Sequence, residues 1–165
     1  MTAGEALERI LPLYSEFYTV TVGAGAAAPF QAEAECVVND EQYTAYRTVK
    51  ISEVVSRELV FFAAADSLDA EQALALAEAA WEEGLRRVRP GPNHRNTDIV
   101  LVALTESLSD EAARALRKLR RVRNYRYTFH GWSTLRVVAI ETSSGRKTFN
   151  RMGQSLKKLY GNIHF

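Results

Sequence analysis

The chain has 165 residues, 47% of them apolar and 25% charged, which is an average composition for one globular domain with an ordinary hydrophobic core. The formal net charge of +1 conceals an asymmetry, because residues 1–80 carry thirteen acids against four Lys or Arg, whereas residues 81–165 carry seven acids against seventeen. A lone cysteine, Cys36, excludes a disulfide framework and a cysteine-based metal site, and no segment is long and apolar enough for a membrane helix. The first residues also lack the basic and apolar regions of a secretory signal. We therefore expect a single domain over residues 1–165, in the cytoplasm and without membrane contact.

The first half of the sequence predicts one helix followed by four strands. Apolar residues at helical spacing indicate a helix over residues 5–17, which Pro12 should kink or shorten. Four alternating or apolar segments follow, at residues 18–22, 31–38, 43–51 and 59–63. The second and third should pair as an antiparallel hairpin around a polar connection at residues 39–42. The fourth is continuously apolar, which is typical of a strand covered on both faces.

The second half alternates helices and strands. An Ala-rich helix capped by Asp66 or Ser67 should run to about Val88. Its buried stripe includes Leu74 and Trp81. The remaining elements are a buried strand at residues 99–104, a helix capped by Ser109, two hairpin strands at 125–129 and 135–140, a short strand ending at Phe149 and a last helix capped by Asn150. The order α-β-β-β-β-α-β-α-β-β-β-α predicts an α+β fold with a mixed, mainly antiparallel sheet and about four helices.

Residues 23–29, Gly-Ala-Gly-Ala-Ala-Ala-Pro, follow a predicted strand and have the glycines of a dinucleotide-binding loop. In such a loop the next element is a helix, whose N-terminus receives the phosphates. Here a proline and an alternating strand follow, so we interpret the segment as a flexible hairpin loop. We expect no cofactor.

The opening order of one helix, three strands and a helix resembles the core topology of restriction-endonuclease-like nucleases. The resemblance implies an acid on one strand and an acid-x-Lys motif on the next, which together hold a divalent metal ion. Glu33 or Glu35 could be the first acid, but the return strand reads Thr48-Val49-Lys50, with threonine where the second carboxylate is required. Glutamates on a solvated strand face are therefore the favoured interpretation. A metal-dependent nuclease remains an alternative only if the fold brings Glu33 or Glu35 near another acid.

The three histidines, His94, His130 and His164, have no serine or cysteine partner at motif spacing. The first lies in a loop rich in proline and glycine, the second beside a predicted hairpin turn and the third one residue from the end. We interpret them as surface histidines. The sequence therefore predicts no catalytic residue and no metal ligand, and the balance is against an enzyme.

The strongest functional signal is a basic segment at residues 114–126, which contains seven Lys or Arg and no acid. Leu116, Leu119 and Val122 should form its buried stripe, which leaves the cations exposed. Aromatic residues interleave with arginine at the end of the segment, and more cations come later in the chain. The candidate binding surface consists of Arg117, Arg120, Arg121, Arg123, Tyr125, Arg126, Tyr127, Lys147 and Arg151.

Two functions suit such a surface. The leading hypothesis is a non-catalytic protein-interaction module that could self-associate, since the acidic half of one copy could pair with the basic half of another. The alternative is binding of single-stranded RNA or DNA, because guanidinium groups bind phosphates and aromatic rings stack on unpaired bases. Against this alternative, the acidic half should offset the attraction to a polyanion beyond a Debye length of about 8–10 Å.

The last part of the chain contains Phe129-His-Gly-Trp132, a hydrophobic strand with Arg136, and Thr148-Phe-Asn-Arg-Met-Gly153 before a lysine-rich helix. This pattern, over about the last 40 residues, resembles a family of uncharacterised short cytosolic proteins of Gram-positive bacteria. The resemblance implies a bacterial cytosolic protein of unknown function. Since the family has no assigned activity, the resemblance implies no functional residue.

Overall fold

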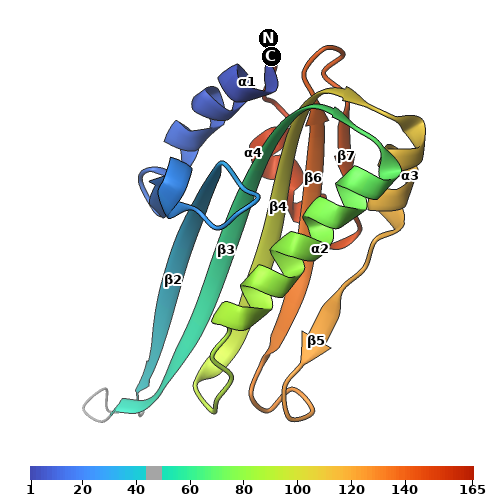
Figure 1. Ribbon diagram of the computed structural model, residues 1–165. Coiled ribbons are helices and arrows are strands. Elements are labelled where there is room, and N and C mark those ends of the chain that lie inside the picture. Colours follow the sequence, from blue (N-terminus) through green and yellow to red (C-terminus); the bar gives the residue numbers. More distant parts are fainter. Residues whose placement is uncertain (44–49) are drawn as a thin grey trace.

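The computed structural model describes residues 1–43 and 50–165, with side chains described for residues 1–39 and 54–165. One mixed β-sheet lies at its centre, with helices on both faces (Figure 1). The strands are β1 (Thr19–Val22), β2 (Ala32–Tyr43), β3 (Lys50–Leu68), β4 (His94–Leu108), β5 (Val122–Asn124), β6 (Trp132–Glu141) and β7 (Lys147–Phe149). The helices are α1 (Ala3–Ile10), α2 (Ala70–Arg87), α3 (Asp110–Lys118) and α4 (Lys157–Tyr160), with the 3-10 turns η1 (Leu11–Tyr14), η2 (Gly23–Gly25) and η3 (Met152–Leu156).

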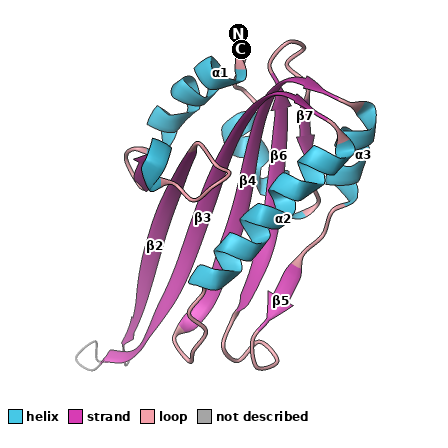
Figure 2. Cartoon of the chain, in the orientation of Figure 1, coloured by secondary structure: helices cyan, strands magenta, loops and turns pink. Residues whose placement is uncertain are grey.

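The strand order across the sheet is β1-β2-β3-β4-β6-β5 (Figure 2). The short strand β7 also pairs with β6, further along that strand than β5 does. Strands β3, β4 and β6 run parallel, because a helix crosses over between each of them and the next. The pairs β1–β2, β2–β3, β5–β6 and β6–β7 are antiparallel. The predicted α+β fold with a mixed, mainly antiparallel sheet and four α-helices is therefore confirmed.

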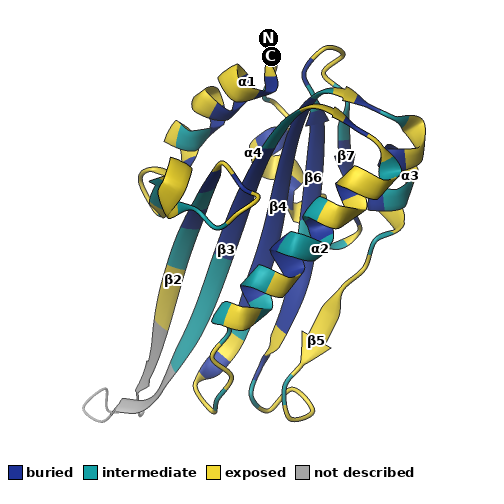
Figure 3. Ribbon diagram, viewed as in Figure 1, coloured by how far each residue is buried: buried dark blue, intermediate teal, exposed yellow. Residues whose placement is uncertain are grey.

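Alternate side chains of the three central strands face opposite helical layers. On one face, Leu59, Ile99 and Leu135 lie in register and pack against α2 and α3. On the other face, Val60 and its neighbours pack against α1, η1, η3 and α4. Figure 3 shows that the central strands are buried where the helices cover them. The apolar run at residues 59–63 is thus a strand covered on both faces, as predicted.

The N-terminal elements differ from the prediction mainly in length. α1 ends before Pro12 and a 3-10 turn follows, so the proline shortens the helix as expected. Residues 39–42 are not a connection, because they lie within β2 and pair with β3. The predicted return strand at residues 43–51 falls largely outside the described residues. β3 begins at Lys50 and continues to Leu68, so the apolar run belongs to the same strand.

Two details of α2 also differ. The predicted cap residues 66–67 belong to β3, so the cap moves along the chain to Asp69. The Asp69 carboxylate accepts a hydrogen bond from the Gln72 N–H (2.7 Å), and the Gln72 side chain accepts one from the Asp69 N–H (3.0 Å). This capping box fixes the start of the helix. Trp81 is buried as predicted, whereas Leu74 is exposed because smaller alanines form most of the buried stripe.

The segment after α3 departs furthest from the prediction. α3 starts at its predicted cap, Ser109, but ends at Lys118, and Leu119 already has an extended backbone. Val122 therefore leaves the predicted helical stripe and lies in β5, where 40% of it is exposed. Residues 125–129, predicted as a strand, form the turn between β5 and β6.

The side chain of Asn150 fills a gap in the edge of β6 between β5 and β7, and it is fully buried. Its Oδ1 accepts hydrogen bonds from the N–H groups of Val137 (2.9 Å) and Gly153 (2.8 Å). Its Nδ2 donates to the carbonyl oxygens of Leu119 (3.1 Å) and Leu135 (2.9 Å). The bond to Gly153 reaches the start of η3, where a cap was predicted. A Cβ atom at Gly153 would lie 2.4 Å from the Val137 oxygen, so this close approach requires glycine.

The sheet order converts the charge asymmetry of the sequence into a spatial one. Strands β1, β2 and β3 come from the acidic half and occupy one side of the sheet, whereas β4, β6, β5 and β7 come from the basic half and occupy the other (Figure 1). β1 and β5 are separated by five inter-strand steps, or about 24 Å at roughly 4.8 Å a step.

Candidate functional site

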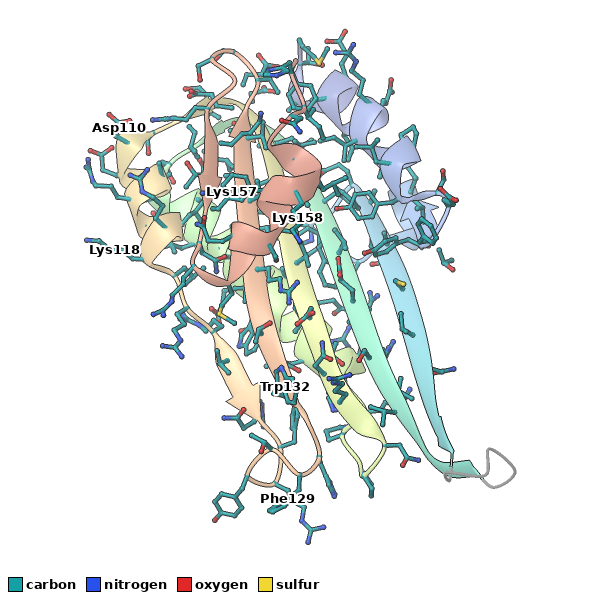
Figure 4. All side chains as sticks on the ribbon, turned by 180° about the vertical axis from the view of Figure 1, so that it is seen from behind. Asp110, Lys118, Phe129, Trp132, Lys157 and Lys158 are labelled. Carbon is teal, nitrogen blue, oxygen red and sulfur yellow. The ribbon has the colours of Figure 1, made fainter. Side chains whose placement is uncertain are left out.

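The basic segment lies along one edge of the sheet. It runs from the last turn of α3 through an extended linker into β5, and then into the turn before β6. Figure 4 shows Lys118 and Phe129 along this edge, whereas Lys157 and Lys158 project from α4 over the sheet face. We define the basic edge as Arg117, Lys118, Arg120, Arg121, Arg123, Tyr125, Arg126, Tyr127, Phe129 and Arg151, all exposed except the half-buried Tyr125.

The turn between β5 and β6 is anchored at its base. The Tyr125 N–H donates to the Gly131 oxygen (2.9 Å), and the Tyr125 hydroxyl hydrogen-bonds the Ser133 hydroxyl (2.9 Å). The His94 ring lies edge-on to Tyr125 with 5.7 Å between ring centroids, and its Nδ1 donates to the His130 oxygen (2.7 Å). His94 is buried, so its interpretation as a surface histidine is wrong. Gly131 has a φ of 89°, and a Cβ atom there would lie 2.4 Å from the His94 Nδ1, so the position requires glycine.

The tip of this turn presents aromatic rings to solvent. Arg126, Tyr127 and Thr128 have φ values of 47°, 53° and 77°, a region that residues other than glycine rarely adopt. Tyr127 is 92% exposed and Phe129 is 80% exposed. Strained backbone of this kind persists only where the surrounding structure holds it, and such strain gathers at functional sites. The anchored base therefore holds two large aromatic side chains out in water.

Most cations of the basic edge have no acidic partner among the residues that the structure describes. Arg121 pairs with Glu78 of α2 at 3.3 Å. Arg123 lies over the Tyr125 ring, 5.9 Å from its centroid, where the cation and the ring attract each other. Apart from Arg121, the basic edge has six cations, and no acid in the described part of the chain pairs with any of them. They are Arg117, Lys118, Arg120, Arg123, Arg126 and Arg151. These side chains are available to an external anion.

Arg151 joins the basic edge through the fold, although it is far from the other members in the sequence. The hydrogen bond from Asn150 Nδ2 to the Leu119 oxygen holds two backbone segments together. Arg151 and Arg120 are the next residue in each segment, and both are exposed. The basic edge is therefore wider than the segment from α3 to β6.

Lys147 is the one predicted candidate that lies apart from the basic edge. It is on β7, which pairs with β6 about six residues, or roughly 20 Å, beyond the pairing of β5. Its Nζ donates to the Gly161 oxygen (3.1 Å). Conversely, Lys118 and Phe129 belong to the edge but were not chosen as candidates. Their signal was their place within the basic segment and the aromatic run.

Glu33 and Glu35, the two candidate metal ligands, are ion-paired on the face covered by α2. Both oxygens of Glu33 accept hydrogen bonds from Arg87, each at 3.0 Å. Burial alone would raise the pKa of Glu33, but the hydrogen bonds from Arg87 hold it below its ordinary value. Glu35 pairs with Arg57. Glu33 is therefore half-buried in an ion pair and not on a solvated face, whereas Glu35 is 38% exposed and stays partly solvated, and arginine neutralises the charge of both.

Three further features concern a metal site or a membrane: the rest of the nuclease-like motif, clusters of metal-ligating side chains, and long apolar helices. The Thr48-Val49 part of the nuclease-like motif and the side chain of Lys50 lie outside the described residues. Within the described ranges, no group of three His, Cys, Asp or Glu side chains is placed to hold a metal ion. No helix in the part of the chain that the structure describes is long and apolar enough to cross a membrane.

Comparison with known proteins places the chain in a family. The model of a domain of unknown function, DUF8052, matches residues 2–162, nearly the whole length. The chain belongs to this family. No curated protein and no solved structure matches it. The expectation of an uncharacterised family is confirmed, and the match extends far beyond the last 40 or so residues that suggested it.

Proposed function

We propose that this protein binds single-stranded RNA or DNA through the basic edge and catalyses no reaction on it. One observation carries the proposal: six cations with no acidic partner among the described residues share one edge of the sheet with two aromatic side chains that are almost entirely exposed. Cations in this state can neutralise phosphates, and exposed rings can stack on unpaired bases.

The aromatic residues support nucleic acid as the ligand. Large apolar groups held in solvent at one place mark interaction sites on many proteins. Tyr127 and Phe129 are largely exposed at the tip of a turn, where they could insert between splayed bases. Stacking of one base on an aromatic side chain contributes about 1–3 kcal/mol and tolerates any base.

Charge placement weakens the main objection to nucleic-acid binding, although Glu78 of the acidic half pairs with Arg121 at the edge itself. From the sequence, a protein contact was favoured because the acidic half should offset attraction to a polyanion. In the fold, β2, which carries Glu33 and Glu35, lies four inter-strand steps from β5, or about 19 Å, which is about two Debye lengths of 8–10 Å. The acids of β2 are therefore largely screened from a nucleic-acid strand that lies along the basic edge.

A protein contact remains the second candidate function. The outer edge of β5 pairs with no other described strand, and a free edge can add a strand from another chain. The acidic side of a second copy would also complement the basic edge. This alternative differs from the first in its readout, because it predicts concentration-dependent sedimentation in the absence of nucleic acid.

We also propose the cytoplasm of a bacterium, in keeping with the resemblance to proteins of Gram-positive bacteria, as the place where the protein acts. RNA is the more abundant single-stranded ligand there. Fractionation of the source cells and detection of the protein by antibody would test this location.

The binding test is fluorescence anisotropy with labelled single-stranded RNA and DNA of mixed sequence over a salt series. A log–log plot of affinity against salt should be linear, with a slope of about −0.7 for each phosphate neutralised. Arg120→Ala with Arg123→Ala should make the slope shallower by up to about 1.4. Tyr127→Ala with Phe129→Ala should weaken binding by about tenfold or more and leave the slope unchanged.

The matched control is Lys157→Ala with Lys158→Ala, which removes two cations that lie on α4, away from the basic edge. This control should bind almost as tightly as the wild type. If the wild type does not bind single strands at low salt, or if the α4 variant loses as much affinity as the Arg120 and Arg123 variant, the proposal is wrong. Sedimentation that depends on these arginines without nucleic acid would favour the protein contact instead.

A further inference from the structure

A polar cavity lies on the sheet face opposite α2, and it is independent of the basic edge. On this face α1, η1, η3 and α4 cover one half of the central strands, and the other half carries no helix (Figure 4). The cavity lies on the uncovered half next to η1 and has a volume of about 210 Å³. Its lining residues are Tyr18, Cys36, Val38, Ser56, Arg57, Glu58, Asn96 and Asp98, of which Val38 forms an apolar wall.

Two carboxylates meet in this cavity because of the strand register. Glu58 on β3 pairs with Asp98 on β4, and Asp98 pairs with Thr134 on β6. In parallel neighbours, residues in register point to the same face, about 4.8 Å apart. Ser56 and Asn96 are also in register, one pleat further along, and the Ser56 hydroxyl donates to Asn96 Oδ1 (3.0 Å).

The two carboxylates differ in their partners. Asp98 accepts a hydrogen bond from the Thr134 hydroxyl (3.0 Å) and pairs with Arg136 (3.0 Å). Glu58 has only the neutral Tyr18 hydroxyl as a donor among the described side chains. The guanidinium group of Arg57, the residue before Glu58, points to the other face of the sheet, where it contacts Glu35. Among the described residues, one arginine therefore serves two carboxylates, and Glu58 has no ion-pair partner of its own.

Glu58 is electrostatically unfavourable as it stands. Burial raises the pKa of its carboxyl group, and the nearby Asp98 raises it further, against the smaller opposing effects of Tyr18 and Arg136. A ligand that brings one positive charge and several hydrogen-bond donors would remove this penalty. The acceptors for those donors are the Glu58 carboxylate, the Ser56 hydroxyl and Asn96 Oδ1.

We propose that this cavity binds a small primary ammonium compound, with the ammonium group on Glu58 and a short carbon chain against Val38 and the Tyr18 ring. A volume of about 210 Å³ holds about seven atoms of water size, at roughly 30 Å³ each. A bare divalent cation fits less well, since it requires several charged oxygen ligands and Arg136 already neutralises Asp98.

Titration calorimetry with n-butylammonium chloride at pH 7 tests the proposal. We expect a dissociation constant of about 0.1–1 mM for a ligand of this size. n-Butanol, which is neutral and of similar shape, should not bind. Glu58→Gln keeps the shape of the side chain but removes its charge, so it should weaken butylammonium binding by about tenfold or more. The matched control is Glu82→Gln, at an exposed position on α2, which should bind as the wild type does.

The single cysteine of the chain provides a second measurement on the unmutated protein. Cys36 lines the cavity, so bound butylammonium should slow its alkylation by iodoacetamide, whereas n-butanol at the same concentration should not. No protection of Cys36, equal binding by Glu58→Gln, or binding of Mg²⁺ or Zn²⁺ in place of butylammonium would each overturn the proposal. The Arg120 and Arg123 variant should bind butylammonium normally, so this test and the nucleic-acid test can fail separately.

Discussion

The two sides of the sheet use arginine in opposite ways. On the side built by β2 and β3, Arg87 binds Glu33 and Glu83, and Arg57 binds Glu35. At the basic edge, most arginines face water with no acid beside them in the described part of the chain. This difference separates the charges that stabilise the fold from those that remain available to a ligand. Paired and half-buried arginines hold α2 to the sheet, whereas unpaired ones contribute little to stability and can serve a ligand.

Residue type alone does not separate these roles. Arg87 lies 5.3 Å from the centroid of the Phe61 ring and Arg123 lies 5.9 Å from that of Tyr125, so both pack on an aromatic ring. Phe61 is buried in the core, whereas Tyr125 anchors an exposed turn. The distinction comes from what surrounds each arginine, and the predictions below test it in order of expected effect.

The largest effect is expected at Asn150, which joins the basic edge to the rest of the sheet. Asn150→Ala would leave the Val137 N–H and the Leu119 and Leu135 carbonyl groups without their side-chain partner. We expect the free energy of unfolding to fall by about 2–4 kcal/mol, measured by urea denaturation. Asn162→Ala, at an exposed position, should change it by less than about 0.5 kcal/mol. An equal effect of both substitutions would contradict the role given to Asn150.

The next effect is expected on the paired side. Arg87→Met would leave Glu33 and Glu83 without their shared partner and should lower the free energy of unfolding by about 1–3 kcal/mol at pH 7. Nucleic-acid binding should not change. The matched control is Arg86→Met, whose more exposed ion pair with Glu83 should contribute at most about 0.5 kcal/mol.

The pH dependence of the Arg87 variant has a definite sign. The pKa of Glu33 is lowered in the folded protein, so its ion pair stabilises the fold above the ordinary value of 4.5 and loses this contribution as the pH falls through the lowered value. The difference between wild type and Arg87→Met should therefore be full at pH 7 and shrink below about pH 4.5. A difference that grows in acid would show that packing, not charge, is what Arg87 contributes.

A smaller effect, of opposite sign, is expected at the tip of the basic edge. Thr128 is β-branched and has a φ of 77°, which costs a side chain of this shape more than it costs glycine. Thr128→Gly should raise the free energy of unfolding by up to about 1 kcal/mol, because relief of strain exceeds the extra entropy of the unfolded chain. Thermal denaturation followed by circular dichroism would measure it. A loss of stability would show that the turn does not store strain.

The sequence predicted the core of the fold but not its basic edge. Continuous apolar runs and helix caps, such as Ser109, carry local signals that survive in the structure. The prediction for Leu119 to Phe129 was wrong because alternating tyrosine and arginine has the period of a strand. The turn instead depends on Gly131 and on positive φ angles at residues whose type does not predict them. The bond between Asn150 and Leu119 joins residues 31 apart, so the place of Arg151 was beyond any local pattern.

The same limit applies to the carboxylates. Glu33 and Glu35 alternate on one strand and drew attention, whereas Glu58 and Asp98 are 40 residues apart and meet only because β3 and β4 pair in one register. A one-residue shift of either strand would send these side chains to opposite faces of the sheet. Sequence patterns reveal neighbours along a strand, but partners across strands depend on register.

The smallest expected change in stability is at Glu58, which sharpens the comparison because no cation in the described part of the chain pairs with this acid alone. Its pKa is raised in the folded protein, first by burial and then by Asp98, while Arg136 and Tyr18 act in the other direction. The folded state therefore binds a proton more readily than the unfolded chain does, and stability falls as the pH rises from 4.5 through the raised value.

Glu58→Gln keeps an acceptor for the Tyr18 hydroxyl but cannot ionise, so it should be more stable than the wild type at pH 7 and lose that advantage below about pH 4.5. Urea denaturation from pH 4 to pH 8 would measure the difference. If Glu58→Gln is instead less stable than the wild type at pH 7, the charge of Glu58 stabilises the fold as the charges of Glu33 and Glu35 do. The argument that Glu58 is available to a cationic ligand would then fail.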